Sequence, residues 1–207
     1  MTGWATTAEL AGPRLHDALA TCGASFGTDR LDIQGQRLVE LVTWLLAVPV
    51  ATAQLNHAPV PDISAANVLV WIGPEPPEGN GLKLLRTDAT LGGGNDPHHA
   101  IDAHLAPLIE AVHEHTKRPE AALRRAVKDR YDAAITWVAQ LSNQPERAFE
   151  LLADRAELRL LDLGTHELLL HVREGCCLYY RTPANVKCFS CPLLDDEARR
   201  RLVAGGG

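Results

Sequence analysis

The sequence predicts an α+β fold that is mostly helical, with a small antiparallel sheet and a cysteine-rich loop near its C-terminus. Three observations support this prediction. Apolar residues recur at helical spacing over several long stretches of residues 1–156. The β-rich runs are short and do not alternate with helices one by one, as a parallel α/β sheet requires. Four of the five cysteines fall within residues 176–191.

The N-terminal part of the chain is expected to be helical. Residues 1–30 predict one or two short helices, which Pro13 can open and Gly23 can close. Residues 36–47 carry leucine and valine at helical spacing, which predicts a longer helix. Pro49 is expected to break or restart that helix, because proline lacks a backbone N–H.

Charge and hydropathy limit the partners and location of the protein. A net charge of -6 and a pI near 5.8 argue against nucleic acid as a partner, which usually requires a basic excess. The first residues show no secretory signal, so we expect a cytoplasmic protein. The apolar stretch 38–55 contains Glu40 and Pro49, which predicts a buried helix and no integral membrane segment. Peripheral contact with the inner face of the cell membrane stays open.

Short strands and capped helices are expected in the middle of the chain. Residues 67–73 and 82–91 are β-rich and predict a hairpin with a long loop. The sequence GGGND at residues 92–96 lacks the pattern of a P-loop or a dinucleotide fold and is expected to be a turn. Asp96 can cap the next helix, and Pro97 fits its first position. Helices are therefore expected over residues 97–117, 120–141 and 145–154.

Histidines are concentrated in the helix that begins at Pro97. No two of them have the i, i+4 spacing of a helical metal site, and the chain has no HExxH motif. We expect most of these side chains to be exposed or to cap the helix, and the sequence assigns residues 98–115 no role. The histidines are His98, His99, His104, His113 and His115.

The C-terminal quarter predicts a hairpin, a cysteine-rich loop and a short helix. Residues 157–163 and 166–173 are β-rich and flank a Gly-Thr pair, which indicates a hairpin. Residues 195–204 predict the final helix. We expect a helical region at 1–156 and a hairpin with the cysteine segment at 157–207, together forming one compact unit.

The clustered cysteines follow the spacing Cys-Cys-x10-Cys-x2-Cys, at Cys176, Cys177, Cys188 and Cys191. Thiols stay reduced in the cytoplasm, so metal ligation by all four is favoured over two disulfides. A redox-active Cys188-x-x-Cys191 pair would leave the adjacent cysteines unexplained. The fifth cysteine, Cys22, is expected to be a small buried apolar residue.

The adjacent pair bears on the choice of metal, since four thiolates suit either zinc or an iron–sulfur cluster. In an extended backbone, neighbouring side chains point to opposite faces, which suits one tetrahedral ion poorly. A [2Fe-2S] cluster is wider because each of its two irons takes two thiolates, and adjacent cysteines with a local bend can reach it. Geometry therefore favours iron–sulfur and leaves zinc as the alternative.

The string CCLYYR at residues 176–181, followed by CxxCP at 188–192, resembles the C-terminal signature of the FhuF-like ferric siderophore reductases. The resemblance implies that the four clustered cysteines bind one [2Fe-2S] cluster. It also implies one-electron reduction of ferric iron in a siderophore, most simply of the hydroxamate type, with release of ferrous iron in the cytoplasm. Because no flavin or nicotinamide motif is visible, the electron is expected from an external donor such as a ferredoxin or a flavoprotein.

Basic residues flank the cysteines in the sequence. Arg173, Arg181 and Lys187 lie next to the expected ligands, where positive charge would stabilise the reduced, more negative cluster. A second basic group has two interpretations, a solvated helix face or a positive rim that steers an anionic chelate or an acidic electron donor. Its members are Arg199, Arg200 and Arg201.

Two other functions stay open from the sequence. In the first, zinc on the four cysteines only stabilises an interaction module. In the second, the cluster senses redox state or iron and catalyses nothing. If the protein is a reductase, the helical region at residues 1–156 is expected to lie close to the substrate.

Overall fold

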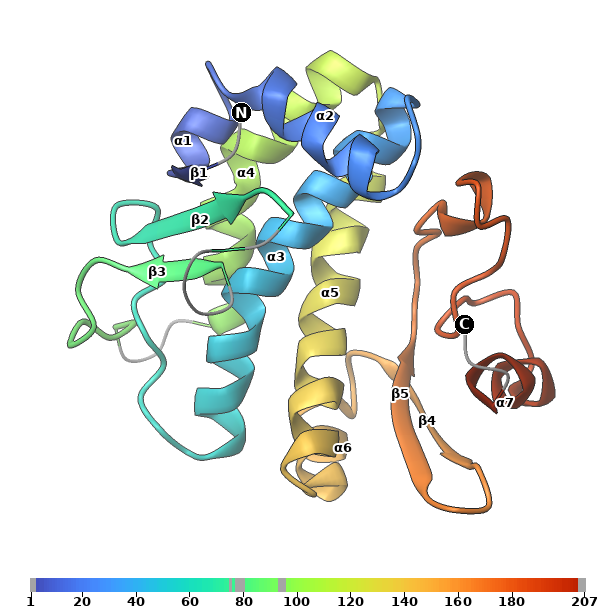
Figure 1. Ribbon diagram of the computed structural model, residues 1–207. Helices are drawn as coiled ribbons and strands as arrows, with labels where there is room; N and C mark the ends of the chain where they lie inside the picture. Colours follow the sequence, from blue (N-terminus) through green and yellow to red (C-terminus); the bar gives the residue numbers. More distant parts are fainter. Residues whose placement is uncertain (1–2, 75, 77–80, 93–95, 205–207) are drawn as a thin grey trace.

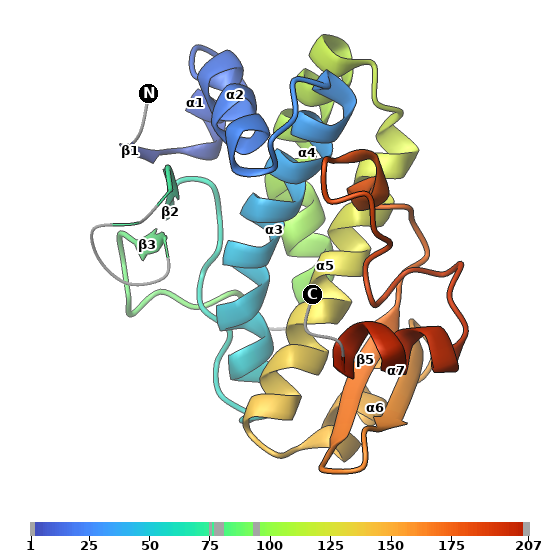
Figure 2. The ribbon, with the colours of Figure 1, turned by 45° about the vertical axis from the view of Figure 1, so that its right-hand side comes forward.

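Three long helices form the centre of the molecule, and β structure lies on two opposite sides of them (Figures 1 and 2). The computed structural model describes residues 3–74, 76, 81–92 and 96–204. A small sheet lies on one side of the helices, and a hairpin followed by the cysteine segment lies on the other. The central helices are α3 (Leu31–Leu55), α4 (Pro97–Thr116) and α5 (Glu120–Leu141). This arrangement confirms the predicted α+β class.

Helix α3 is continuous, so the predicted break at Pro49 is wrong. The proline lies inside the helix, which begins at Leu31, earlier than expected. A proline in a helix interior costs about 3 kcal/mol. Here Leu46 and Val50, on either side of it, are fully buried. Packing along the length of α3 therefore outweighs the missing hydrogen bond.

The two short N-terminal helices are confirmed, but their boundaries differ from the prediction. They are α1 (Thr7–Leu10) and α2 (Leu15–Ser25), and Gly23 lies inside α2. A Cβ at Gly23 would lie 2.4 Å from Gln34 Nε2, so this glycine allows α2 and α3 to approach closely. The left-handed residue that follows the helix is Gly27, with φ of 61°. Cys22 is buried in α2 as expected, and burial raises its pKa to about 12.

The small sheet is antiparallel with strand order β1-β2-β3, and it includes a strand that the sequence did not predict. Its strands are β1 (Gly3–Ala5), β2 (Val68–Ile72) and β3 (Leu82–Leu84). In the register of the sheet, Val70 pairs with Ala5 on one side and Leu82 on the other. Strand β3 is shorter than predicted, and Thr90 forms only an isolated bridge to Pro61. Part of the predicted turn at 92–96, residues 93–95, lies outside the described residues.

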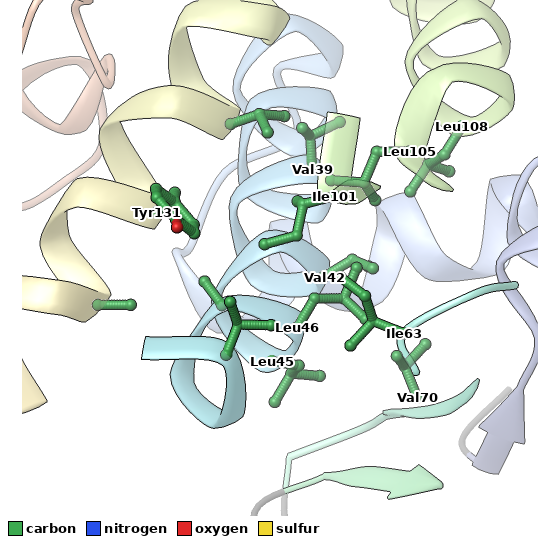
Figure 3. Packing of buried hydrophobic residues seen from close by; sticks show 14 of the residues in the cluster. Val39, Val42, Leu45, Leu46, Ile63, Val70, Ile101, Leu105, Leu108 and Tyr131 are labelled. Atoms are coloured by element: carbon green, nitrogen blue, oxygen red, sulfur yellow. The ribbon is translucent and has the colours of Figure 1, made fainter. Parts of the chain in front are cut away.

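The main core lies between the three long helices and the small sheet (Figure 3). Val42 and Leu46 of α3 and Leu105 of α4 are fully buried there. Tyr131 of α5 is also fully buried, and its hydroxyl donates to Gln54 Oε1 at 2.7 Å. Helix α3 is long and apolar enough to cross a membrane, but 67% of its apolar window is buried inside the protein. The high hydropathy of α3 is thus explained by its place in the core of the protein.

Three histidines of α4 depart from the expectation of exposure, because His98 and His113 are half-buried and His104 is buried. His99 and His115 are exposed, whereas His104 is buried. Its Nδ1 lies 2.5 Å from the carbonyl oxygen of Ile63, and its Nε2 lies 2.9 Å from Thr7 Oγ1. His104 therefore ties α4 to α1 and to the segment before β2.

The C-terminal hairpin packs against α5 and positions the cysteine segment. It consists of β4 (Glu157–Asp162) and β5 (Glu167–Val172) and follows α6 (Pro145–Leu152). Gln140 of α5 donates to the Glu167 carbonyl at 3.1 Å and accepts from the Leu169 amide at 2.8 Å. Leu169 reaches the main core. The chain therefore leaves β5 alongside α5, and it ends in α7 (Asp196–Ala204).

The cap of α4 offers a test of the fold. Asp96 Oδ1 accepts the His98 amide at 3.1 Å. We expect Asp96→Ala to lower the free energy of unfolding by about 1 kcal/mol, because an amide at the helix start loses its partner. Asp96→Asn keeps the cap but loses the Arg155 contact at 3.8 Å, and should stay close to wild type in urea denaturation. Equal losses in both variants would contradict the assignment.

Candidate metal centre

The four clustered cysteines lie in the loop between β5 and α7. All four are free thiols: Cys177 and Cys191 are buried, Cys188 is half-buried and Cys176 is exposed. The two arms of the loop are joined by a hydrogen bond of 2.9 Å from the Arg173 amide to the Ser190 carbonyl. This bond brings the residues before the adjacent cysteines next to the Cys-x-x-Cys turn.

The sulfur atoms of Cys177 and Cys188 lie 3.4 Å apart. The backbone bends sharply after the adjacent cysteines, because Leu178 has left-handed dihedral angles (φ 60°, ψ 10°). The Leu178 amide donates to the sulfur of Cys176 at 3.4 Å. In the other arm, the Cys191 amide donates to the Cys188 carbonyl at 2.9 Å, which closes the Cys-x-x-Cys turn. The local bend that adjacent ligands need is therefore present.

The structure brings only part of the expected ligand set into contact. Within the described part of the chain, no three Cys, His, Asp or Glu side chains are placed to hold one metal ion. The sulfurs of Cys177 and Cys188 lie 3.4 Å apart, whereas the Cys176 sulfur accepts the Leu178 amide. The loop is thus folded toward a thiol cluster with two of its four sulfurs already adjacent.

The donors present fit a thiolate-bound group such as a [2Fe-2S] cluster. A metal–sulfur distance of about 2.3 Å in a tetrahedron separates two sulfurs by roughly 3.8 Å, close to the observed Cys177–Cys188 separation. The Cys188 thiol and the charge of Arg173 both lower the pKa of Cys177, although burial opposes them. Nε and Nη2 of Arg37, which stacks on Tyr179 of the same loop, are buried and have no hydrogen-bond partner among the described residues. Thiolates in a positive environment are the ligands that such a group requires.

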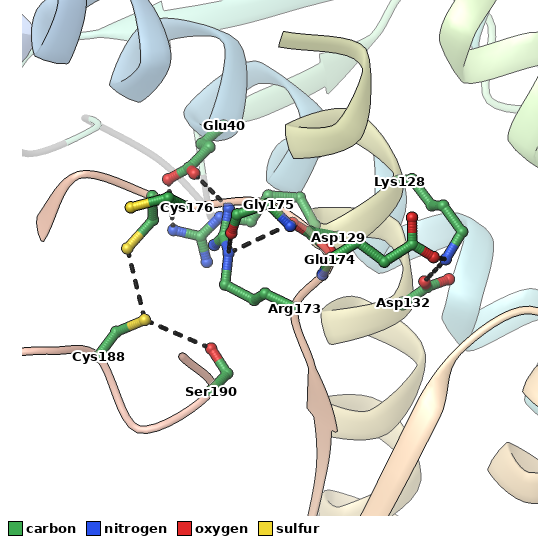
Figure 4. Close-up of polar contacts among 12 residues, drawn as sticks. Glu40, Lys128, Asp129, Asp132, Arg173, Glu174, Gly175, Cys176, Cys188 and Ser190 are labelled. Atoms are coloured by element: carbon green, nitrogen blue, oxygen red, sulfur yellow. Dashed lines mark hydrogen bonds and ion pairs between the residues drawn. The ribbon is translucent and has the colours of Figure 1, made fainter. Parts of the chain in front are cut away.

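A buried glutamate on α3 joins the helical core to the cysteine loop (Figure 4). Glu40 is 1% exposed and forms ion pairs with Arg173 at 2.6 Å, Arg37 at 2.7 Å and Arg130 at 3.3 Å. Burial by itself raises the pKa of Glu40, but the three guanidinium groups outweigh it and lower this pKa to about 2. The sequence shows Glu40 only as an interruption of an apolar stretch, and its role was missed.

Helix α5 holds the residues directly before the adjacent cysteines. The Asp129 carboxylate accepts the amides of Glu174 at 2.8 Å and Gly175 at 3.0 Å, and it lies 3.4 Å from Arg173 Nε (Figure 4). A Cβ at Gly175 would approach Asp129 Oδ2 to 3.2 Å and Arg125 Cβ to 3.4 Å. Glycine therefore allows the chain to pass close to α5 just before Cys176.

Two further arginines hold the carbonyl groups of the first and last cysteines. Arg118, between α4 and α5, donates to the Cys176 carbonyl at 3.2 Å. Arg199 of α7 donates to the Cys191 carbonyl at 2.8 Å. Sequence reasoning missed Arg118, which lies 58 residues before its partner. Both contacts limit the movement of the loop ends.

An aromatic stack covers the loop on the side of α2. The guanidinium carbon of Arg37 lies 4.5 Å from the ring centre of Phe26 and 5.5 Å from that of Tyr179. The two rings are edge to face, with centres 6.4 Å apart. The tyrosine therefore packs between the N-terminal helices and the cysteine loop, within a short 3₁₀ turn (Tyr179–Arg181).

The basic residues expected to surround the cysteines fall into two groups. Arg173 is buried and lies beside Cys177 and Cys188. Burial by itself lowers the pKa of Arg173, but Glu40 and Asp129, followed by the two cysteines, outweigh it and raise this pKa. Arg181 and Lys187 are exposed on the loop, and Arg181 stacks on Tyr180 with 5.5 Å between its guanidinium carbon and the ring centre.

The second basic group does not form the continuous exposed face that the sequence suggested. Arg199 is 3% exposed and turns inward to Cys191 and Asp196. These two contacts hold its guanidinium against the end of the cysteine loop and the start of α7. Arg200 and Arg201 lie further out and pair with Glu197 at 4.0 and 3.4 Å.

The fold and this loop define a class of protein: a helical α+β protein with a C-terminal thiolate site set against buried positive charge. A comparison with models of protein families identifies the type of this loop more closely. The model of the FhuF 2Fe-2S C-terminal domain matches residues 173–193, which include all four clustered cysteines. The chain thus carries an FhuF-type iron–sulfur domain with a [2Fe-2S] cofactor, as the resemblance implied. No curated protein and no solved structure matches the chain.

Glu40 is expected to be important for stability. Glu40→Gln should lower the free energy of unfolding by about 3–5 kcal/mol, because it leaves buried guanidinium groups without their counter-charge. The control is Glu110→Gln, at an exposed position of α4, which should change stability by less than about 0.5 kcal/mol. Urea denaturation at neutral pH measures both. A wild-type stability for Glu40→Gln would show that the ion pairs contribute little.

His171 of β5 should make stability depend on pH. It is 4% exposed, and burial, followed by the charges of Arg173, Arg130 and Lys128, lowers its pKa from 6.5 to about 3. Below pH 6.5, His171 is protonated in the unfolded chain but stays neutral in the folded protein. Protonation therefore favours the unfolded chain, and the free energy of unfolding falls as the pH falls from 6.5 toward 3.

The test compares His171→Leu with wild type in urea denaturation between about pH 7.5 and pH 5. The difference in stability between the two proteins should change over this range, with the variant losing less as pH falls. The exposed His99 provides the control, since His99→Leu should keep the wild-type slope. Parallel curves for wild type and His171→Leu would exclude this role of the buried imidazole.

Proposed function

We propose that the protein reduces ferric iron held by a siderophore to ferrous iron and so releases it in the cytoplasm. The observation that carries this proposal is the match of residues 173–193 to the FhuF 2Fe-2S C-terminal domain. The contact between the sulfurs of Cys177 and Cys188, at 3.4 Å, supports it as the start of a thiolate site. The reaction adds one electron to the ferric chelate and yields ferrous iron and the free siderophore.

The proposed ligands of the cluster are Cys176, Cys177, Cys188 and Cys191. When bound there, a [2Fe-2S] cluster supplies one electron at a time. The chain holds the ends of the loop in place through Arg118 and Arg199, which bind the carbonyl groups of its first and last cysteines. An external ferredoxin or flavoprotein is the proposed source of the electron.

The substrate chemistry explains why reduction releases the iron. Ferric iron is a hard cation and binds the oxygen donors of a siderophore tightly, whereas ferrous iron binds the same oxygens far more weakly. One electron is therefore enough to turn a tight chelate into a labile one. We propose hydroxamate chelates as the substrates because their iron is held entirely by oxygen.

The buried arginines favour the reduced form of the site. Arg173 lies close enough to Cys177 and Cys188 for their charges to affect its pKa, and the buried Arg37 stacks on Tyr179 of the same loop. A positive charge in a low-dielectric interior stabilises an added negative charge more strongly than one in water does. These side chains therefore raise the tendency of the site to accept the electron that it passes on.

The ligand proposal is tested with Cys188→Ser. Anaerobically purified wild type should be red-brown and give an electron paramagnetic resonance signal after dithionite reduction, and the variant should lose both. Reduced wild type should also release ferrous iron from a ferric hydroxamate to a ferrous trap, and the variant should not.

The matched control is Cys22→Ala, which removes the thiol in α2 and should keep colour, signal and ferrous release. A colourless wild type with stoichiometric zinc would support a zinc-stabilised module instead. A coloured wild type that releases iron no faster than Cys188→Ser would support a non-catalytic sensor.

A further inference from the structure

A hollow of about 640 Å³ lies between the hairpin, the end of the cysteine loop and α7. Its volume is in the range of about 300–1,000 Å³ that is typical of sites for small molecules. Helix α7 lies beside the hairpin in both views of the fold (Figures 1 and 2). Charged residues from β4, the loop and α7 line the hollow: Glu157, Arg159, Arg173, Glu174, Asp195, Asp196 and Arg199.

The hollow is next to the candidate metal centre. Pro192, which lines it, directly follows Cys191 in the chain. Arg199 lines it as well and donates to the Cys191 carbonyl at 2.8 Å. Arg173 lines it from the other side, and its amide binds the Ser190 carbonyl at 2.9 Å. A molecule in this hollow would thus lie against the residues that support the cysteines.

The accessible charges of the hollow are mainly negative. The side chains of Arg173 and Arg199 are 5% and 3% exposed, and they bind Glu40 and Asp196. In contrast, Glu157 is 53% exposed, and Glu174, which pairs with Lys128 at 2.7 Å, is 50% exposed. Asp196 is 42% exposed, and Asp195 also lies at the surface.

Arg159 does not cancel this acidic rim, which consists of Glu157, Glu174, Asp195 and Asp196. It is 39% exposed and forms ion pairs with Glu157 and Asp196, both of which belong to the rim. Lys128, which pairs with Glu174, is 24% exposed and does not line the hollow, so solvent meets more carboxylate than cationic side chain around the opening. A rim of one sign attracts ligands of opposite charge and repels ligands of like charge.

We propose that the ferric chelate binds in this hollow and that the acidic rim selects chelates by charge, favouring cationic over neutral and neutral over anionic ones. The inference rests on the proposed function and names where its substrate binds. Three hydroxamates neutralise ferric iron, so a trihydroxamate with a free ammonium group is cationic, whereas a ferric tricatecholate carries three negative charges. From the sequence, the arginines of α7 suggested a positive rim that attracts anionic chelates. The structure favours cationic chelates instead, because Arg199 is buried and the exposed rim is acidic.

The test uses the reduced holoprotein and two ferric trihydroxamates that differ in one group. One carries a free ammonium, and the other is the same chelate with that amine acetylated and hence neutral. For wild type, the KM for the cationic chelate should be lower. The double variant E157Q/D195N should raise that KM about three- to tenfold, with kcat unchanged and little effect on the neutral chelate. Added salt should have the same selective effect.

The control variant E110Q/D88N removes the same charge at two exposed positions that do not line the hollow, one in α4 and one in the segment after β3. It should behave as wild type with both chelates. Equal KM values for the two chelates in wild type, or E157Q/D195N behaving as the control, would contradict the inference. An unchanged electron paramagnetic resonance spectrum shows that the rim variants keep the loop intact.

Gallium(III) complexes of the same two chelates separate this inference from the proposed function, because gallium is not reduced. Calorimetry on the holoprotein should show tighter binding of the cationic gallium complex, and weaker binding of it to E157Q/D195N. Charge-selective gallium binding without any ferrous release would uphold the hollow as a chelate site and reject the reductase. Ferrous release from ferric chelates without charge-selective gallium binding would uphold the reductase and reject this site.

Discussion

The ion pair between Glu40 and Arg173 is the interaction on which the placement of the cysteine loop depends. Glu40 lies in the middle of α3, in the core of the helical region, and Arg173 is the first residue after β5. Their atoms are 2.6 Å apart, and both side chains are at least 95% buried. Unbalanced charge at such a site is very unfavourable, and Glu40 and Arg173 each balance part of the other's charge. The pair therefore fixes the start of the loop against the helices.

The other contacts of the loop follow from this anchor. Once Arg173 is held, Glu174 and Gly175 run along α5, where Asp129 accepts both of their amides. Arg118 then reaches the Cys176 carbonyl. Each of these contacts uses a charged or strongly polar group to hold a backbone atom. The helical region thus acts as the rigid support of a loop that has little hydrophobic core of its own.

The charges around the cysteines are divided between interior and surface. Beneath the loop, Arg37, Arg130 and Arg173 surround Glu40, and Asp129 also pairs with Arg173, so three guanidinium groups face two buried carboxylates. At the surface, the acidic rim faces solvent around the neighbouring hollow. The two signs suit different tasks: buried positive charge stabilises electrons at a thiolate site, and exposed negative charge acts on molecules that approach from solution. The protein can therefore carry a net charge of -6 and still place positive charge next to its cysteines.

The sequence by itself determined the helices α4 to α7, the C-terminal hairpin, the burial of Cys22 and a cluster of four thiols, because these depend on local periodicity, capping and cysteine spacing. Tertiary packing decided what local rules could not. Because of this packing, α3 continues through Pro49 and Gly23 lies within α2. The same packing adds β1 to the small sheet and buries Arg199. Packing also brings Glu40 to Arg173, which lies 133 residues further along the chain. Pairings over such distances leave no local pattern in a single sequence, since they depend only on which charges the packed helices bring together.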